Sequence, residues 1–170
     1  PILASAGINI ALIKYWGKRV QAENIPSVGS LSLTLEPWGS ETRVLWRPRR
    51  EAEEGASHFV LNGVEIANGK VDRLLTYIRN LSGLDAHYIA DVQSENSVPT
   101  ASGLASSASG MAALGVASWI ASGLPLTPTS PRSSVEGDDL FLDGSALPQL
   151  LVDGVRIGSG SAPRSLLGGL

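Results

Sequence analysis

Cysteine is absent from the 170-residue chain, and histidine occurs only twice. These absences exclude disulfide bonds, a thiolate zinc site and a cysteine nucleophile, and they leave carboxylates and hydroxyls as the main metal ligands. Basic residues are scarce as well, because 13 Lys and Arg stand against 16 Asp and Glu, a formal charge of −3. Since proteins that bind nucleic-acid backbones carry a basic excess, we do not expect nucleic acid as a partner.

Long hydrophobic runs are also missing. No run reaches the roughly 18 residues of a membrane-spanning helix, and the opening PILASAGINI lacks the basic start of a signal peptide. The sequence therefore predicts a cytoplasmic protein with no membrane partner. Hydrophobic residues nevertheless make up 43% of the chain, which is enough for a core. Its length predicts one full domain with part of another.

Hydrophobic periodicity predicts a series of strands followed by helices. Residues 4–14 are apolar and β-compatible, and a polar loop follows around residues 18–26. The order lacks the regular strand–helix alternation of a parallel sheet and therefore predicts an α+β fold. The remaining predicted elements are strands at 30–38 and 41–48 with a turn at Pro37 and Gly39, a hairpin at 58–67 around Asn62-Gly63, a helix at 71–81 ending at Ser82-Gly83, a strand at 87–95 and a small-residue helix at 103–123.

The stretch from residue 124 to 155 has a different composition. It contains several prolines, and from residue 133 onward it is acidic and free of Lys and Arg. We expect an exposed loop or irregular insertion, with LPQLLV (147–152) as its only ordered piece. Its aspartates are interpreted as solvated loop charges: Asp138, Asp139, Asp143 and Asp153.

The segment PTASGLASSASG (99–110) combines a proline, two glycines and four serines at the predicted start of a helix. A helix start presents unpaired N–H groups and a partial positive charge, so it binds phosphates, and small residues would let a triphosphate approach the backbone. The segment is not the Walker pattern, because no lysine follows its glycine. On its residues alone it also fits a helix selected for close packing.

Two further segments place cations beside small residues. In INIALIKYWGKR (8–19), Lys14 and Lys18 lie where the first strand ends, and such cations suit an anionic substrate. In GSGSAPRS (158–165), Arg164 accompanies Ser159 and Ser161 on a glycine-rich backbone, and an arginine matches a carboxylate or phosphate with paired hydrogen bonds. A solvated strand end and a flexible surface loop remain the alternatives.

Four motifs in order resemble one family: ALIKYWGKR, SLSLTL, SENSVPTASGLASSASG and RIGSGSAPRSLLGG. Together they resemble the N-terminal part of the mevalonate diphosphate decarboxylases, which belong to the GHMP kinase superfamily. The resemblance covers residues 3 to about 126 and resumes at 156–169. It implies a GHMP-type N-terminal domain (ribosomal protein S5 domain 2-like), with a mixed sheet packed against helices and the C-terminal domain missing.

The resemblance also implies a reaction. Such enzymes use ATP and Mg²⁺ to phosphorylate the tertiary hydroxyl of (R)-5-diphosphomevalonate, and loss of that phosphate and of CO2 yields isopentenyl diphosphate. Lys14 would lie near the reacting centre, Arg164 would hold the carboxylate that leaves, and Ser107 would lie near Mg²⁺. The implied substrate-binding residues are Tyr15, Trp16, Gly17, Lys18, Lys70, Ser159, Gly160, Ser161, Ala162, Pro163 and Arg164, and the implied ATP-binding residues are Pro99, Ser102, Gly103, Leu104, Ala105, Ser106 and Ser107.

The chain departs from the family pattern in three respects. The family's catalytic aspartate belongs to the C-terminal half and has no match here, residues 127–155 diverge, and Pro163 replaces a small residue and removes one N–H donor. We therefore expect domains at 1–126 and 156–170 separated by a divergent segment at 127–155, and little activity from this chain alone. A homodimer is expected for full-length relatives. The alternatives are a GHMP-family small-molecule kinase that phosphorylates mevalonate or phosphomevalonate without decarboxylation, and a non-catalytic truncated product.

Overall fold

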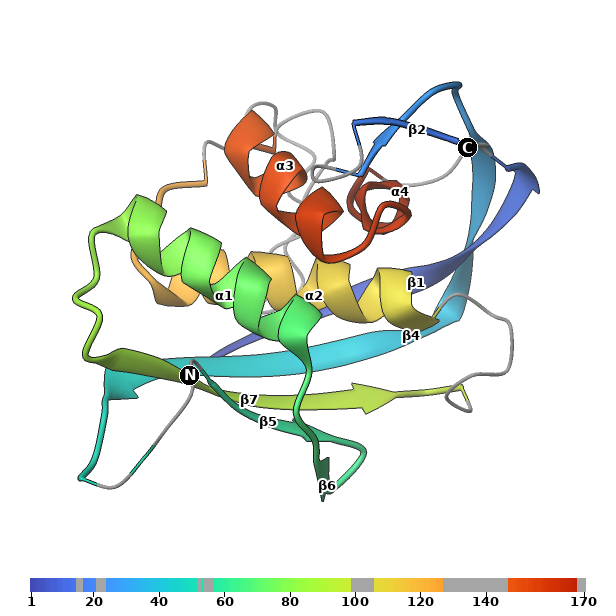
Figure 1. Ribbon diagram of the computed structural model, residues 1–170. Coiled ribbons are helices and arrows are strands. Elements are labelled where there is room, and N and C mark those ends of the chain that lie inside the picture. The colour runs from blue at the N-terminus through green and yellow to red at the C-terminus, as the bar shows by residue number, and fades with distance from the viewer. Residues whose placement is uncertain are drawn as a thin grey trace.

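The structure is a computed structural model that describes residues 1–14, 17–20, 24–51, 53, 57–98, 106–126 and 147–167. Its base is a five-stranded sheet in the order β1-β4-β7-β5-β6 (Figure 1). Neighbouring strands are antiparallel except β5 and β7, so the sheet is mixed. The strands are β1 (Ile2–Ile13), β4 (Leu31–Pro48), β5 (Ser57–Leu61), β6 (Val64–Glu65) and β7 (Tyr88–Asn96), and β2 (Lys18–Val20) and β3 (Ile25–Pro26) form a separate ribbon.

The described helices all cover one face of the sheet (Figure 1). They are α1 (Gly69–Ser82), α2 (Ser106–Ala121), α3 (Gln149–Gly158) and α4 (Ala162–Leu166). The helix α2 lies directly on the sheet, and α3 packs on α1 and α2. This arrangement confirms the predicted α+β class with a mixed sheet packed against helices.

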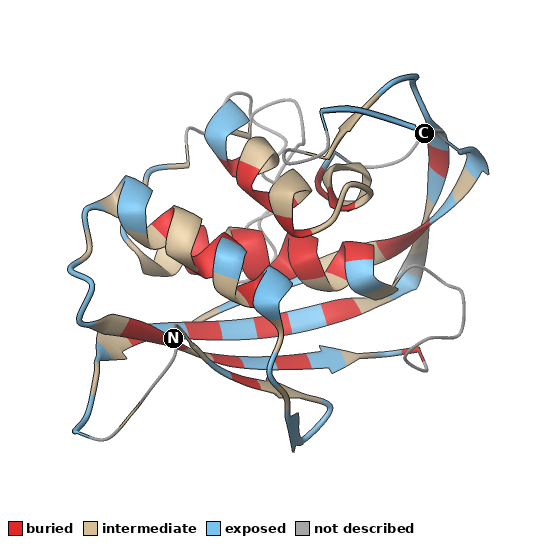
Figure 2. Cartoon of the chain, viewed as in Figure 1, coloured by how far each residue is buried: buried red, intermediate tan, exposed pale blue. Residues whose placement is uncertain are grey.

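The core lies between the helices and the sheet, where Figure 2 shows the buried residues gathered. The apolar residues of α1 that recur at helical spacing are buried there: Val71, Leu74, Leu75 and Ile78. The small residues of α2 let α3 approach closely. A Cβ atom added at Gly115 would lie 2.2 Å from Val155 Cγ2, so this contact requires glycine.

Local signals account for the ends of α1 and for the β5–β6 hairpin. Asn68 caps α1 by accepting hydrogen bonds from the backbone N–H groups of Lys70 and Val71, and Gly83 ends the helix at φ +73°. Asn62 and Gly63 form the hairpin turn, both with positive φ. The predictions for these two regions are confirmed.

The turn predicted at Pro37 and Gly39 is wrong, because residues 31–48 form one continuous strand. In the pairing with β1, Ile8 faces Leu35 and Gly7 faces Gly39, so residues 36–38 form a bulge without partners. A proline is tolerated in a bulge because its missing N–H is not needed there. A Cβ atom at Gly39 would lie 2.3 Å from the backbone oxygen of Ala6, so only glycine fits at the end of the bulge.

The prediction of a loop up to residue 155 is wrong for its last part. The helix α3 begins at Gln149, and its Leu151 and Val155 are fully buried. Asp153 is therefore a helical residue, paired with Arg156 at 3.0 Å, and not a loop charge. The ordering of 147–152 is confirmed in part, since α3 starts within it. Asp138, Asp139 and Asp143 lie outside the described residues.

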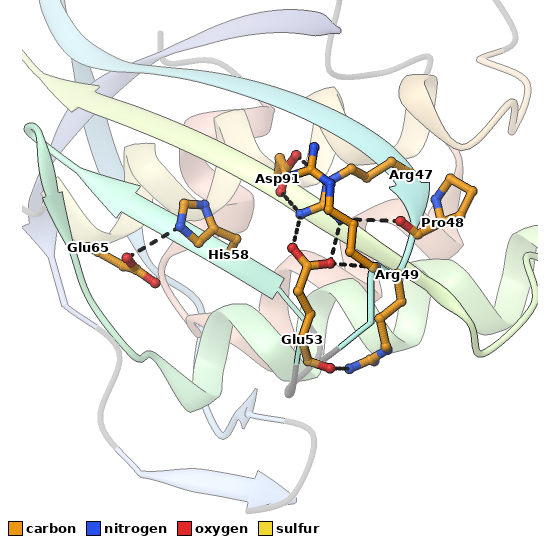
Figure 3. Close-up of polar contacts among 8 residues, drawn as sticks. Arg47, Pro48, Arg49, Glu53, His58, Glu65 and Asp91 are labelled. Atoms are coloured by element: carbon orange, nitrogen blue, oxygen red, sulfur yellow. Dashed lines mark hydrogen bonds and ion pairs between the residues drawn. The ribbon is translucent and has the colours of Figure 1, made fainter.

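An ion-pair network ties the end of β4 to β7 and to the following loop (Figure 3). The Arg47 guanidinium bonds Asp91 through Nε at 2.6 Å and Glu53 through Nη2 at 2.7 Å. These hydrogen bonds hold the pKa of the Glu53 carboxyl at about 2, well below its ordinary value, and raise the pKa of Arg47. The network lies in the first half of β7, whereas Asn96 is the last residue of that strand.

None of the helices in the described part of the chain is long and apolar enough to span a membrane.

Candidate functional site

A cavity of about 320 Å³ opens between the sheet and the starts of α1 and α2. One wall is apolar and includes Phe59, Leu61 and Ile66 from β5 and the segment after β6. Residues from the first three turns of α2 and from the C-terminal end of α3 line another part of the cavity. The remaining lining residues are Thr42, Asn68, Lys70, Val71, Ser94, Asn96, Ser106, Ser107, Gly110, Met111, Leu114, Gly158 and Ser159.

The predicted phosphate segment reaches this cavity through its last residues. Ser106 and Ser107 are the first two residues of α2, and both line the cavity. No Asp or Glu occupies the first turn of α2, so nothing there opposes an anion. The other predicted ATP-binding residues lie outside the described residues: Pro99, Ser102, Gly103, Leu104 and Ala105.

Lys70 lines the same cavity from the first turn of α1. Its backbone N–H bonds the Asn68 side chain at 3.0 Å, which fixes the direction in which α1 begins. The structure thus brings a cation of α1 and two hydroxyls of α2 around one space. The sequence resemblance implied substrate binding for Lys70, and its neighbours in the cavity come from both predicted sets, Ser106 and Ser107 from the ATP set and Ser159 from the substrate set.

The third predicted segment forms the α3–α4 corner and not a flexible loop. Ser159 lines the cavity next to Gly158, and its hydroxyl lies 3.2 Å from that of Ser161. Gly160 occupies the tight turn, and Ala162, fully buried, begins α4. Pro163 is in the first turn of α4, where a backbone N–H has no helical partner. A proline in place of the family's small residue therefore costs this helix no hydrogen bond.

Arg164 belongs to a group of buried polar atoms that find no partner. Among the described residues, the buried side-chain atoms without a hydrogen bond are Asn9 Oδ1, Thr34 Oγ1 and Arg164 Nε. Asn9 and Thr34 face each other across β1 and β4, and Asn9 Nδ2 donates to the hydroxyl of Ser165, which is next to Arg164. Because such atoms are costly to leave unpaired, the neighbouring Asn9 and Thr34 and the separate Arg164 Nε are candidates for contact with a polar ligand.

Asn9 was missed by the sequence reading. It is 1% exposed, and it is the one amide side chain in an otherwise apolar run, ASAGINIALI. An asparagine between two isoleucines of a predicted strand is a signal that could have identified it.

The predicted cations of the second segment lie at the surface. Lys14 follows β1 and Lys18 begins β2, and both are exposed, as is Gly17 between them. The turn between β2 and β3 reaches α3, because Asn24 Nδ2 donates to the carbonyls of Arg156 and Ile157 at 3.1 Å each. This ribbon therefore docks beside the α3–α4 corner. Tyr15 and Trp16 lie outside the described residues.

The described residues hold no cluster of three or more His, Cys, Asp or Glu that could bind a metal ion. A metal here would take its ligands from hydroxyls such as Ser107 and from the oxygens of a bound phosphate chain, a donor set that suits Mg²⁺.

Comparison with known proteins identifies relatives of the whole chain. The diphosphomevalonate decarboxylase of Ganoderma lucidum is 39% identical over 179 residues, which cover 98% of this chain and 39% of the relative. The crystal structure of mevalonate diphosphate decarboxylase from Staphylococcus aureus matches 96% of this chain and 43% of that protein, with a TM-score of 0.72 and 38% identity. A structure of MDDEF in complex with MVAPP, AMPPCP and magnesium matches 96% of this chain and 43% of that protein, with a TM-score of 0.68 and 36% identity.

The chain spans about 40% of the length of these relatives. The model of the diphosphomevalonate decarboxylase-like N-terminal domain matches residues 6–135, more than half of the sequence. With the fold, the motifs and these matches in agreement, the chain belongs to the diphosphomevalonate decarboxylase-like N-terminal domain family.

Proposed function

We propose that this chain forms the nucleotide-binding wall, and part of the substrate-binding wall, of an enzyme that decarboxylates (R)-5-diphosphomevalonate at the expense of ATP. The observation that carries the proposal is the cavity in which an apolar wall, Lys70 and the two serines at the start of α2 come together. A nucleotide has the same division, with a flat apolar base at one end and an anionic chain at the other.

The base of ATP would lie against Phe59, Leu61 and Ile66, and the phosphates would lie at the start of α2. There the free N–H groups and the hydroxyls of Ser106 and Ser107 donate to phosphate oxygens. Lys70 supplies a compact positive charge, which supports a contact with the nucleotide. Residues 99–105 would complete this phosphate site, as the sequence predicts.

Magnesium fits this arrangement when its other ligands are phosphate oxygens. The exposed hydroxyl of Ser107 would hold the ion at the start of α2. When bound, Mg²⁺ neutralises charge on the phosphate chain. The serines and the backbone of this chain serve to position the transferring phosphoryl group, which is the larger part of catalysis in phosphoryl transfer.

The substrate would bind between β1, the β2–β3 ribbon and the α3–α4 corner. The unpaired Nε–H of Arg164 and the hydroxyl of Thr34 would donate to the carboxylate end, and Asn9 Oδ1, an acceptor, would reach it through a water molecule. Residues 159–163 would line this region, and Lys14 and residues 15–18 would hold the diphosphate. Loss of phosphate develops positive charge on carbon, so a site of fixed donors without a nucleophile suits the reaction.

Several broader assignments complete the proposal. We propose domains at 1–126 and 156–170 with a divergent segment between them, a cytoplasmic location, and a homodimer for the full-length form. Because the relatives are more than twice as long, we propose that turnover also needs the part of their fold that lies outside the matched region. The relatives are named decarboxylases, which favours decarboxylation over phosphorylation alone.

The experiment is a calorimetric titration of the chain with Mg-ATP. Lys70→Ala should weaken binding about tenfold, since it removes a charge-assisted contact. Arg73→Ala is the matched control, because Arg73 is an exposed cation of the same helix that does not line the cavity, and it should bind like the wild type. Equal binding by both variants would contradict the proposed nucleotide site.

A coupled ADP-release and CO2-release assay tests the reaction. A full-length protein carrying this domain should release both products from (R)-5-diphosphomevalonate, and the 170-residue chain should release neither at an appreciable rate. ADP release without CO2 would support a small-molecule kinase instead. Rapid turnover by the chain alone would show that the catalytic base lies within these residues.

A further inference from the structure

A buried hydrogen-bond relay connects the first turn of α2 to the side chain of Asn96 at the end of β7. Ser40 Oγ lies 2.6 Å from Asn96 Oδ1 and 2.8 Å from Ser109 Oγ. Ser40 is 1% exposed and Ser109 is 0% exposed. The relay therefore joins β4, β7 and α2 beneath the helix start where Ser106 and Ser107 line the cavity.

The distances determine the direction in which the protons are donated. A separation of 2.6 Å is typical of O–H···O and shorter than an N–H···O bond, so Ser40 donates to the carbonyl oxygen of Asn96. A serine has one proton to give, so Ser40 must accept from Ser109 at 2.8 Å. The alternative acceptor for Ser109, the Ser106 carbonyl, is farther away at 3.2 Å.

This direction fixes the orientation of the Asn96 amide. With Oδ1 bonded to Ser40, the Nδ2 group is the part of the amide left for other partners, and no hydrogen bond among the described residues uses it. Asn96 is half-buried and lines the cavity. Its backbone N–H is also held, by Asn62 Oδ1 at 2.9 Å. Both the backbone and the side chain are thus fixed before a ligand arrives.

We infer that Asn96 is a nucleotide-binding residue whose Nδ2 group donates to a phosphate oxygen, and that Ser40 is the positioning residue that keeps this donor turned toward the cavity. The inference rests on the proposed function. The phosphate end is the partner because Asn96 is connected through Ser40 to Ser109, which is in the first turn of α2 beside Ser106. A fixed neutral donor there binds an anion without needing a counter-charge, and its orientation costs nothing on binding.

The test compares the affinity of the 170-residue chain and its variants for two probes, Mg-ATP and Mg-tripolyphosphate, which lacks the base and sugar. Asn96→Ala should weaken both about tenfold. Ser40→Ala, which frees the amide to rotate, should weaken both about threefold. Ser40→Thr retains the hydroxyl and should restore the affinity to within about twofold of the wild type, a rescue that a purely structural role of side-chain volume would not predict.

Ser118→Ala is the matched control for loss of a buried hydroxyl. Ser118 belongs to α2, as Ser109 does, and is 0% exposed. Its hydroxyl donates to the Leu114 carbonyl at 2.6 Å, and it does not line the cavity. This variant should lower the melting temperature and leave both affinities unchanged. Circular dichroism of each variant verifies the fold, and Asn96, being only half-buried, tolerates replacement.

Each other outcome overturns a defined part of the reasoning. Wild-type affinity in Asn96→Ala would show that the amide makes no contact with the phosphates, tighter binding would show that its oxygen faces them, and either result would overturn the inference. Weaker binding of Mg-ATP alone would assign Asn96 to the sugar or base and would overturn the phosphate contact. A wild-type chain that binds neither probe would overturn the proposed function itself, and the inference with it.

Discussion

Replacement of Gly115 by alanine should destabilise the protein, although alanine is the better helix former. The Cβ atom would lie 2.2 Å from Val155 Cγ2, whereas carbon atoms in contact normally lie about 3.5–4.0 Å apart. Val155 is fully buried and β-branched, so its side chain cannot rotate away without a clash elsewhere. The helix α3 must then move away from α2.

The magnitude follows from two opposing effects. Alanine gains about 1 kcal/mol over glycine in a helix interior. Overpacking of a well-filled core costs about 1–3 kcal/mol, and an overlap of this size belongs at the upper end. We therefore expect the free energy of unfolding to fall by about 1–2 kcal/mol.

Urea denaturation measures this change, with an unchanged m-value as evidence that the variant still unfolds in the same way. Gly110→Ala is the control in the same helix, because its Cβ would lie 3.7 Å from Ser40 Oγ, an ordinary contact, and stability should rise or stay level. Adding Val155→Ala to Gly115→Ala should cost less than the sum of the single changes. A Gly115→Ala protein at least as stable as the wild type would refute the close packing of α2 and α3.

Three further changes test other parts of the structure. Glu53→Gln should lower the free energy of unfolding at pH 7, because the depressed pKa of about 2 means that the Glu53 carboxylate stabilises the folded state above about pH 4.5. The wild type loses this stabilisation as the pH falls toward 2, so the free energy of unfolding should depend less on pH in the variant. An unchanged pH dependence between pH 4.5 and 2 would contradict the pairing of Glu53 with Arg47. Asn68→Ala should lower the free energy of unfolding by about 1 kcal/mol through loss of the α1 cap, while Asn68→Asp should retain most of it in urea melts. Asn24→Ala should speed amide hydrogen exchange in the β2–β3 ribbon with little change in melting temperature, and unchanged exchange would show that its bonds to α3 do not hold the ribbon.

Local signals predicted the elements whose structure depends on neighbours in sequence. The Asn62-Gly63 turn and the helical spacing from Val71 to Ile78 each identify one backbone conformation. The continuous strand β4 was not predictable in this way. Pro37 and Gly39 are turn residues by local preference, and only the pairing of the flanking segments with β1 on one side and β7 on the other converts the turn into a bulge.

Residues of the candidate site could be named from the sequence where a family resemblance covers their motifs. They could not be named where their proposed role depends on packing. Lys70 and Ser107 were identified from sequence, and the structure brings them to one cavity. Asn9 and Asn96 were not identified, because their importance comes from atoms left unpaired or oriented by residues far along the chain. No pattern within β7 reports the contacts of Asn96, and the isolated asparagine in β1 does not by itself show which atoms surround it.

The central claim, that a nucleotide occupies the cavity between the sheet and the starts of α1 and α2, is tested most directly by mapping amide chemical shifts during titration with Mg-AMPPCP. We predict saturable shifts at Ile66, Lys70, Ser106 and Ser107, and none at His58 and Leu45, which are exposed residues outside the cavity. Saturable shifts confined to residues away from the cavity, or no saturable shift at all, would contradict it.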